Sequence, residues 1–85
     1  MARASPMALD QIESVLKAIR ALPGVVERKR GIFYRGRDAF LHFHEENGVV
    51  LADLKLEPGG AFTRYILRTA SDRRTLIKAA QDCVT

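Results

Sequence analysis

Tryptophan is absent from this chain of 85 residues, which also has a single cysteine and only two histidines. The one cysteine, Cys83, excludes a disulfide within the chain, so a reducing compartment and a packing role for its thiol are the simplest interpretation. Aromatic residues make up 7% of the chain. This content gives no indication of an aromatic platform for ligand binding.

Long apolar runs are also missing. No run approaches the ~20 residues that a membrane-spanning helix needs, and the first six residues lack the apolar core of a secretory signal, which predicts a cytoplasmic protein without membrane contact. Hydrophobic residues at 47% and charged residues at 28% are typical of one globular domain over residues 1–85. The net charge of +4 favours anionic partners but is modest for a dedicated nucleic-acid binder.

An amphipathic helix is predicted near the start of the chain. Ser5 can cap it, and Pro6 takes the first helical position, where its missing N–H costs no hydrogen bond. Apolar side chains then recur at three- and four-residue spacing at Leu9, Ile12, Leu16 and Ile19. Pro23 and Gly24 end this helix after about four turns.

The middle of the chain changes to short β-rich runs. Strands are predicted over residues 25–34 with a bend at Gly31, 39–45, 49–56 and 62–68. Each connection carries Gly or Pro and none is long enough for a helical crossover, so an antiparallel meander follows. A last helix over residues 72–84 begins at a Thr69 or Ser71 cap. The predicted fold is an α+β two-layer sandwich in the order α-β-β-β-β-α, with both helices on one face of the sheet.

The turns of the predicted meander set which side chains lie opposite one another. With Asn47 and Gly48 as the central residues of a tight hairpin turn, Asp53 lies directly across from His42. With Pro58 and Gly59 as a second such turn, Arg64 lies across from Asp53. His44 shares a face with His42, because side chains alternate along a strand with period 2.

Burial assigns the two faces of the predicted sheet. The face under the helices is expected to carry Leu41, Phe43, Val50, Ala52, Leu54 and Leu56. The open face is expected to carry the polar row of His42, Asp53 and Arg64, with His44, beside Phe33, Phe40, Leu51, Phe62 and Ile66. So many apolar side chains around polar groups predict a ligand pocket or a partner surface, and a symmetric homodimer is the simplest cover.

The polar row suits two kinds of chemistry. A carboxylate beside an imidazole fixes its tautomer, and an adjacent guanidinium can hold that carboxylate or an anionic ligand, which favours anion binding or proton transfer. The alternative is that Asp53 only bridges His42 and Arg64 to satisfy polar groups. His42, His44 and Asp53 also match zinc or iron ligands, but Arg64 would compete with a cation and no further His or Cys pair exists, so no metal is assigned.

A basic set suggests another alternative. It comprises Arg28-Lys29-Arg30, Arg35, Arg37, Arg64, Arg68 and Arg73-Arg74. Gathered on one surface, these side chains could contact nucleic-acid phosphates without reading sequence. Scattered, they form a solvated edge that protects an exposed strand from pairing.

Short motifs follow one another as Leu22-Pro23-Gly24-Val25, Gly36-Arg37-Asp38, His42-Phe43-His44, Ala52-Asp53-Leu54 and Arg68-Thr69 with Asp72. Their order resembles the small luciferase domain family, over most of the chain after Ala21. The spacing before His42 is slightly longer than in the family pattern, and the segment between Asp53 and Arg68 is shorter. The resemblance implies that His42, His44 and Asp53 belong to a site. The light emission in the family name is, for such small members, a label inherited through similarity.

The sequence therefore predicts a small domain that binds an anionic ligand at an open sheet face through His42, His44, Asp53 and Arg64. The alternatives are a homodimerising or protein-interaction module that uses the same face without catalysis, and a basic nucleic-acid-binding module. Neither a reaction nor a cofactor can be named from these residues.

Overall fold

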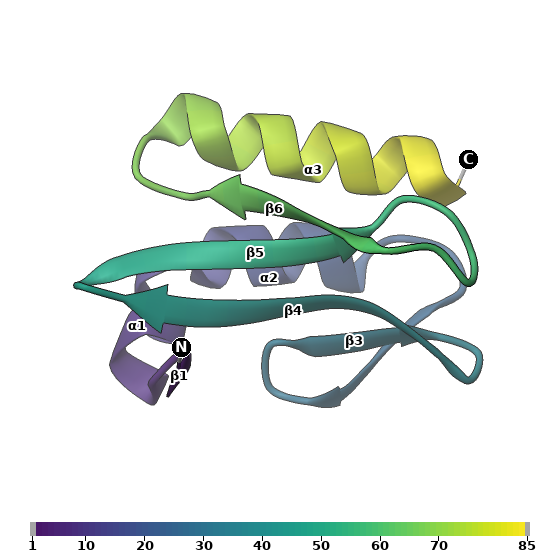
Figure 1. Ribbon diagram of the computed structural model, residues 1–85, viewed down its shortest axis with the longest axis horizontal. Helices are drawn as coiled ribbons and strands as arrows, with labels where there is room; N and C mark the ends of the chain where they lie inside the picture. The colour runs from purple at the N-terminus through teal and green to yellow at the C-terminus, as the bar shows by residue number, and fades with distance from the viewer. Residues whose placement is uncertain (1, 85) are drawn as a thin grey trace.

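Helices from both ends of the chain cover one face of an antiparallel sheet in the computed structural model, which describes residues 2–84 (Figure 1). The elements are β1 (Ala2–Arg3), α1 (Pro6–Gln11), α2 (Glu13–Arg20), β2 (Val25–Lys29), β3 (Ile32–Arg35), β4 (Asp38–Glu46), β5 (Val49–Lys55), β6 (Phe62–Ile66) and α3 (Ala70–Val84). The main strands follow the order β2-β3-β4-β5-β6, and the two-residue β1 pairs with β4. The predicted α+β meander with helices at both ends is confirmed.

The first predicted helix is interrupted at Ile12. α1 ends at Gln11 and α2 begins at Glu13, while Ile12 has a φ of −112° and a ψ of 23°. Ser5 caps α1 as expected, because its hydroxyl accepts a hydrogen bond from the backbone N–H of Ala8 at 3.2 Å. Ile12 is fully buried together with the rest of the apolar stripe. The break therefore leaves the helical spacing of the core side chains intact.

The single strand predicted over residues 25–34 is a hairpin of two strands. The chain turns at Arg30 and Gly31, and Gly31 has a φ of +79°, which L side chains rarely adopt. A Cβ at this position would lie 2.9 Å from Cδ2 of Leu9, so the turn packs closely against α1. The bend expected at Gly31 is a full reversal, and the meander has five strands where four were expected.

The central hairpin has the register that its turn predicts. Asn47 and Gly48 have φ values of 52° and 76°, and a two-residue turn with positive φ at both positions matches the twist of the flanking strands. His42 lies opposite Asp53, and Asp53 lies opposite Arg64 on the next strand. The predicted row across three strands is confirmed.

The core lies between the sheet and the helices. Its buried side chains include Leu9, Ile12, Leu16, Ile19, Leu41, Phe43, Val50, Ala52, Leu54, Leu76 and Ala80. Five of the six side chains predicted for the covered face belong to it. Leu56 is the exception, with an exposed fraction of 42%, because β5 ends at Lys55 and Leu56 lies beyond the paired ladder.

Two aromatic side chains predicted for the open face are core residues. Phe33 lies opposite Leu41 and is fully buried, and Phe40 is 2% exposed within the core cluster. The cause is a β-bulge in the pairing of β3 with β4, where the register shifts between Phe33 and Tyr34. A bulge adds one residue to one strand and breaks the simple alternation of faces.

α3 begins with reciprocal hydrogen bonds between Thr69 and Asp72. The Thr69 hydroxyl accepts from the backbone N–H of Asp72 at 3.0 Å, and the Asp72 carboxylate accepts from the backbone N–H of Thr69 at 3.0 Å. The same carboxylate accepts from the N–H of Arg68 at 2.9 Å. Thr69, of the two predicted caps, is therefore the one used. No helix in residues 2–84 is long and apolar enough to cross a bilayer.

This cap predicts a pH dependence of stability. The backbone N–H donors of Thr69 and Arg68 hold the pKa of Asp72 below its ordinary value of 3.8. A carboxyl group with a depressed folded pKa stabilises the fold above its unfolded pKa, and this contribution disappears as the pH falls through the folded pKa. We expect Asp72→Asn to lower the urea midpoint of unfolding at pH 7, and we expect the midpoints of the variant and the wild type to converge below pH 3.8. If the midpoints differ by the same amount at pH 7 and below pH 3.8, this assignment is contradicted.

Candidate functional site

The four predicted site residues lie on the sheet face that the helices leave open. β4 supplies His42 and His44, β5 supplies Asp53 and β6 supplies Arg64, so three adjacent strands position the site. The neighbours of these residues along each strand, such as Leu41, Phe43, Ala52 and Leu54, point into the core. The packing of the core therefore fixes the backbone that carries the polar row.

Asp53 and Arg64 form a bidentate ion pair at the centre of the site. The Arg64 Nε and Nη2 atoms donate to Asp53 Oδ1 and Oδ2 at 2.9 and 3.0 Å. Asp53 is 6% exposed, whereas the Arg64 side chain is 44% exposed. The guanidinium holds the pKa of the Asp53 carboxyl below its usual range, against the opposing effect of burial. Asp53 is therefore ionised at neutral pH.

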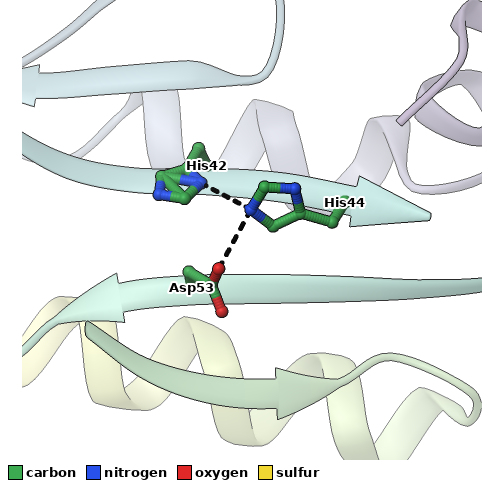
Figure 2. Close-up of side chains that lie close together, drawn as sticks. All are labelled: His42, His44 and Asp53. Atoms are coloured by element: carbon green, nitrogen blue, oxygen red, sulfur yellow. Dashed lines mark hydrogen bonds and ion pairs between the residues drawn. The ribbon is translucent and has the colours of Figure 1, made fainter. Parts of the chain in front are cut away.

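His44, and not His42, contacts the Asp53 carboxylate. The His44 Nε2 atom lies 3.0 Å from Asp53 Oδ2, although the backbone of His42 is the one directly opposite Asp53. The same Nε2 lies 3.0 Å from Nδ1 of His42, and Figure 2 shows the dashed lines from both partners meeting at this nitrogen. Asp53 therefore bridges His44 and Arg64, where the sequence suggested a bridge between His42 and Arg64.

Nε2 is the nitrogen of His44 that makes the hydrogen bond to His42. Within residues 2–84, Nδ1 of His44 is buried and has no hydrogen-bond partner, so Nε2 is the ring nitrogen that benefits from carrying the proton. A bare Nδ1 of His42 then accepts from it, and Asp53 Oδ2 lies 3.0 Å from the same nitrogen. The three side chains thus direct three heteroatoms at one small volume, and one ligand atom from each lies within 4.8 Å of the others.

The surroundings of His42 favour its neutral form. Burial lowers the pKa of His42, nearby His44 lowers it further, and the opposing effect of Asp53 is smaller. Its ring meets Phe62 edge to face, with the ring centroids 4.7 Å apart. A neutral imidazole keeps one bare nitrogen, so His42 can accept a proton or bind a cation.

Arg3 also belongs to the site, although no feature of the sequence pointed to it. It lies opposite His44 on β1, which pairs with the same edge of β4 as β3 does. Between β1 and β3 a hollow of about 190 Å³ is lined by Arg3, Ile32, Tyr34, Ala39, His42, Phe43 and His44. A two-residue strand has too few residues to show alternation, so no sequence pattern could have identified it.

The basic set does not gather on one surface. Arg30 binds Asp10 of α1 at 2.7 Å, whereas Arg64 binds Asp53 on the opposite face of the sheet. Arg28 stacks on the Tyr34 ring at 4.6 Å. Several of the cations are therefore engaged within the protein, which leaves less charge for a phosphate backbone.

Comparisons of this chain with protein-family models, with curated proteins and with solved structures found no match. The resemblance to the luciferase domain family stays a prediction.

The Arg64 and Asp53 pair predicts a non-additive effect on stability. Arg64→Gln leaves a buried carboxylate without its charged partner, so we expect the free energy of unfolding to fall in urea denaturation at pH 7. Adding Asp53→Asn removes the unpaired charge and should recover part of the loss. Arg37→Gln is the control, because it removes the same single positive charge at an exposed turn residue. Additive losses in the double variant would show that the two side chains are not coupled.

Proposed function

We propose that this protein is a small ligand-binding domain that takes a small anion at the open sheet face, beside His42, His44, Asp53 and Arg64. The hollow between β1 and β3 carries the proposal, because it brings a cationic side chain and a histidine pair together on a surface that no helix covers. A cytoplasmic location remains a prediction from the sequence.

Charge supports an anion as the ligand. The Asp53 carboxylate is neutralised by Arg64, whereas the Arg3 side chain makes no ion pair with any residue from 2 to 84. The positive charge of Arg3 is close enough to lower the pKa of His42. An anion in the hollow would meet this guanidinium and the N–H that a neutral imidazole still carries.

The size of the hollow limits the ligand. About 190 Å³ is less than the ~300–1,000 Å³ of pockets that hold drug-sized molecules, so the ligand is the size of a phosphate or a short carboxylate. Ile32 and Tyr34 line the side next to β3. They give this side of the hollow an apolar and aromatic lining for any carbon atoms beyond the charged group.

Titration with inorganic phosphate tests this proposal. In chelator-treated protein at low salt, we expect saturable NMR shifts of the backbone amides of residues 42–44. Arg3→Gln and His42→Ala should each weaken binding at least tenfold, since each removes a donor to the anion. Arg37→Gln removes the same charge outside the hollow and should leave the affinity unchanged. NMR shifts that do not saturate, or an equal loss of phosphate affinity in Arg3→Gln and Arg37→Gln, would refute the proposal.

A homodimer through the same face is the second candidate function. The exposed fractions of Phe62 and Ile66, at the two ends of β6 and on the same face as Arg64, are 39% and 48%, and exposed apolar side chains of this size on one face favour a protein partner. In a symmetric dimer, the polar row would set the register of the two copies.

Sedimentation velocity separates the two candidates. If the face is a dimer interface, wild-type protein should sediment as a dimer at micromolar concentration, and Phe62→Ser with Ile66→Ser should give a folded monomer. Val26→Ser is the matched control, because Val26 is 55% exposed and lies on the distant edge strand β2. A wild-type monomer at hundreds of micromolar would exclude this candidate.

A further inference from the structure

Three heteroatoms that could ligate a metal ion lie within 4.8 Å of one another on the open face. His42 Nδ1 lies 3.0 Å from His44 Nε2, which lies 3.0 Å from Asp53 Oδ2. Zinc–nitrogen and zinc–oxygen bonds measure ~2.0–2.2 Å, so two ligands at right angles about one ion lie ~3 Å apart. Figure 2 shows His42 and Asp53 both directed at the same ring nitrogen of His44.

From this geometry we propose that His42, His44 and Asp53 bind one divalent transition-metal ion. The inference deepens the proposed function and rests on it in one respect, namely that the open face is a ligand site. A metal ion there would lie next to the hollow that holds Arg3, with coordination positions open toward solvent or an anion.

The hydrogen bonding of the site without metal is the first argument. His44 Nε2 forms a hydrogen bond with His42 Nδ1 at 3.0 Å and also lies 3.0 Å from Asp53 Oδ2. A divalent cation between these atoms would engage a lone pair of all three, and the proton of His44 would then lie on Nδ1, which is buried without a partner among residues 2–84. Metal binding has to outweigh this cost, and the convergence of three donor atoms is what favours it.

Arg64 supports the carboxylate ligand and does not displace the metal. Its Nε and Nη2 atoms donate to Oδ1 and Oδ2 of Asp53, and Oδ2 uses its remaining side to face His44 Nε2 at 3.0 Å. Ligating carboxylates are commonly held by such outer hydrogen bonds, which fix their orientation. The competition expected from the sequence becomes a positioning role, because Arg64 approaches from β6 and the histidines from β4.

The donor atoms select the class of metal. Two imidazole nitrogens and one carboxylate oxygen suit zinc, iron or cobalt, whereas magnesium and calcium prefer oxygen ligands alone. Arg64 already neutralises the charge of Asp53, so these two side chains together with a bound divalent ion would have a net charge of +2. This charge would attract an anion into the open coordination positions, next to Arg3.

Metal titration of tag-free, chelator-treated protein in a phosphate-free buffer tests the proposal. We expect one equivalent of Zn²⁺ by calorimetry and of Co²⁺ by visible absorption, with no competition from Mg²⁺. His42→Ala, His44→Ala and Asp53→Asn should each weaken Zn²⁺ binding at least tenfold. Cys83→Ser is the control, because this thiol is the other strong zinc ligand of the chain and lies near Leu56, away from the site.

A readout on the wild-type protein covers the case in which a variant fails to fold. The chain has two histidines, so both imidazole NMR signals report on the site. Paramagnetic Co²⁺ should shift or broaden both, while the amides of residues 78–82 near the end of α3 stay sharp. Unchanged imidazole signals, undiminished binding in folded His42→Ala, or loss of binding in Cys83→Ser would each refute the site.

The metal proposal and the phosphate proposal can be refuted independently of each other. Phosphate is titrated with chelator present, and the metal is titrated without phosphate. Metal binding without phosphate binding would retain the metal site and reject the metal-free anion site. Phosphate binding to metal-free protein, with no Zn²⁺ binding, would retain the anion site and reject the metal site.

Discussion

The bidentate pair between Arg64 and Asp53 is the interaction on which the open face depends. A carboxylate that is 6% exposed needs a charged partner, because an unpaired ion removed from water is costly. The partner comes from the directly opposite position of the next strand. A slip of one residue would turn Arg64 toward the core and leave Asp53 without its partner, so the chemistry of the site and the register of the sheet require each other.

The turns made much of the fold predictable. Asn47 and Gly48 both adopt positive φ, and this turn can be predicted from the sequence because few other residue pairs adopt positive φ at both positions. The reversal at Gly31 was harder to recognise, because a lone glycine in an apolar run predicts a bend as well as a hairpin. The bulge near Phe33 and Phe40 has no residue signature, and its effect on the two aromatic side chains could not be predicted.

The candidate site shows the same division between backbone and side chain. Register placed His42, Asp53 and Arg64 in one row, and the structure confirms the row. It also shows that His44 reaches diagonally to Asp53, which depends on strand twist and rotamers that spacing alone does not determine. Arg3 could not be found at all, because its contribution comes from a strand of two residues.

The shortness of β1 has a consequence for access to the site. Beyond its own two-residue ladder, the segment is held by Ala4 N–H donating to Phe43 O at 3.3 Å and by Ser5 N–H donating to Glu45 Oε1 at 3.1 Å. So few contacts can break without disturbing the central strands, so local opening costs less free energy than global unfolding. Detachment would carry Arg3 away and widen the mouth of the hollow. The hollow would then open by detachment of β1, while the histidines on β4 stay in place.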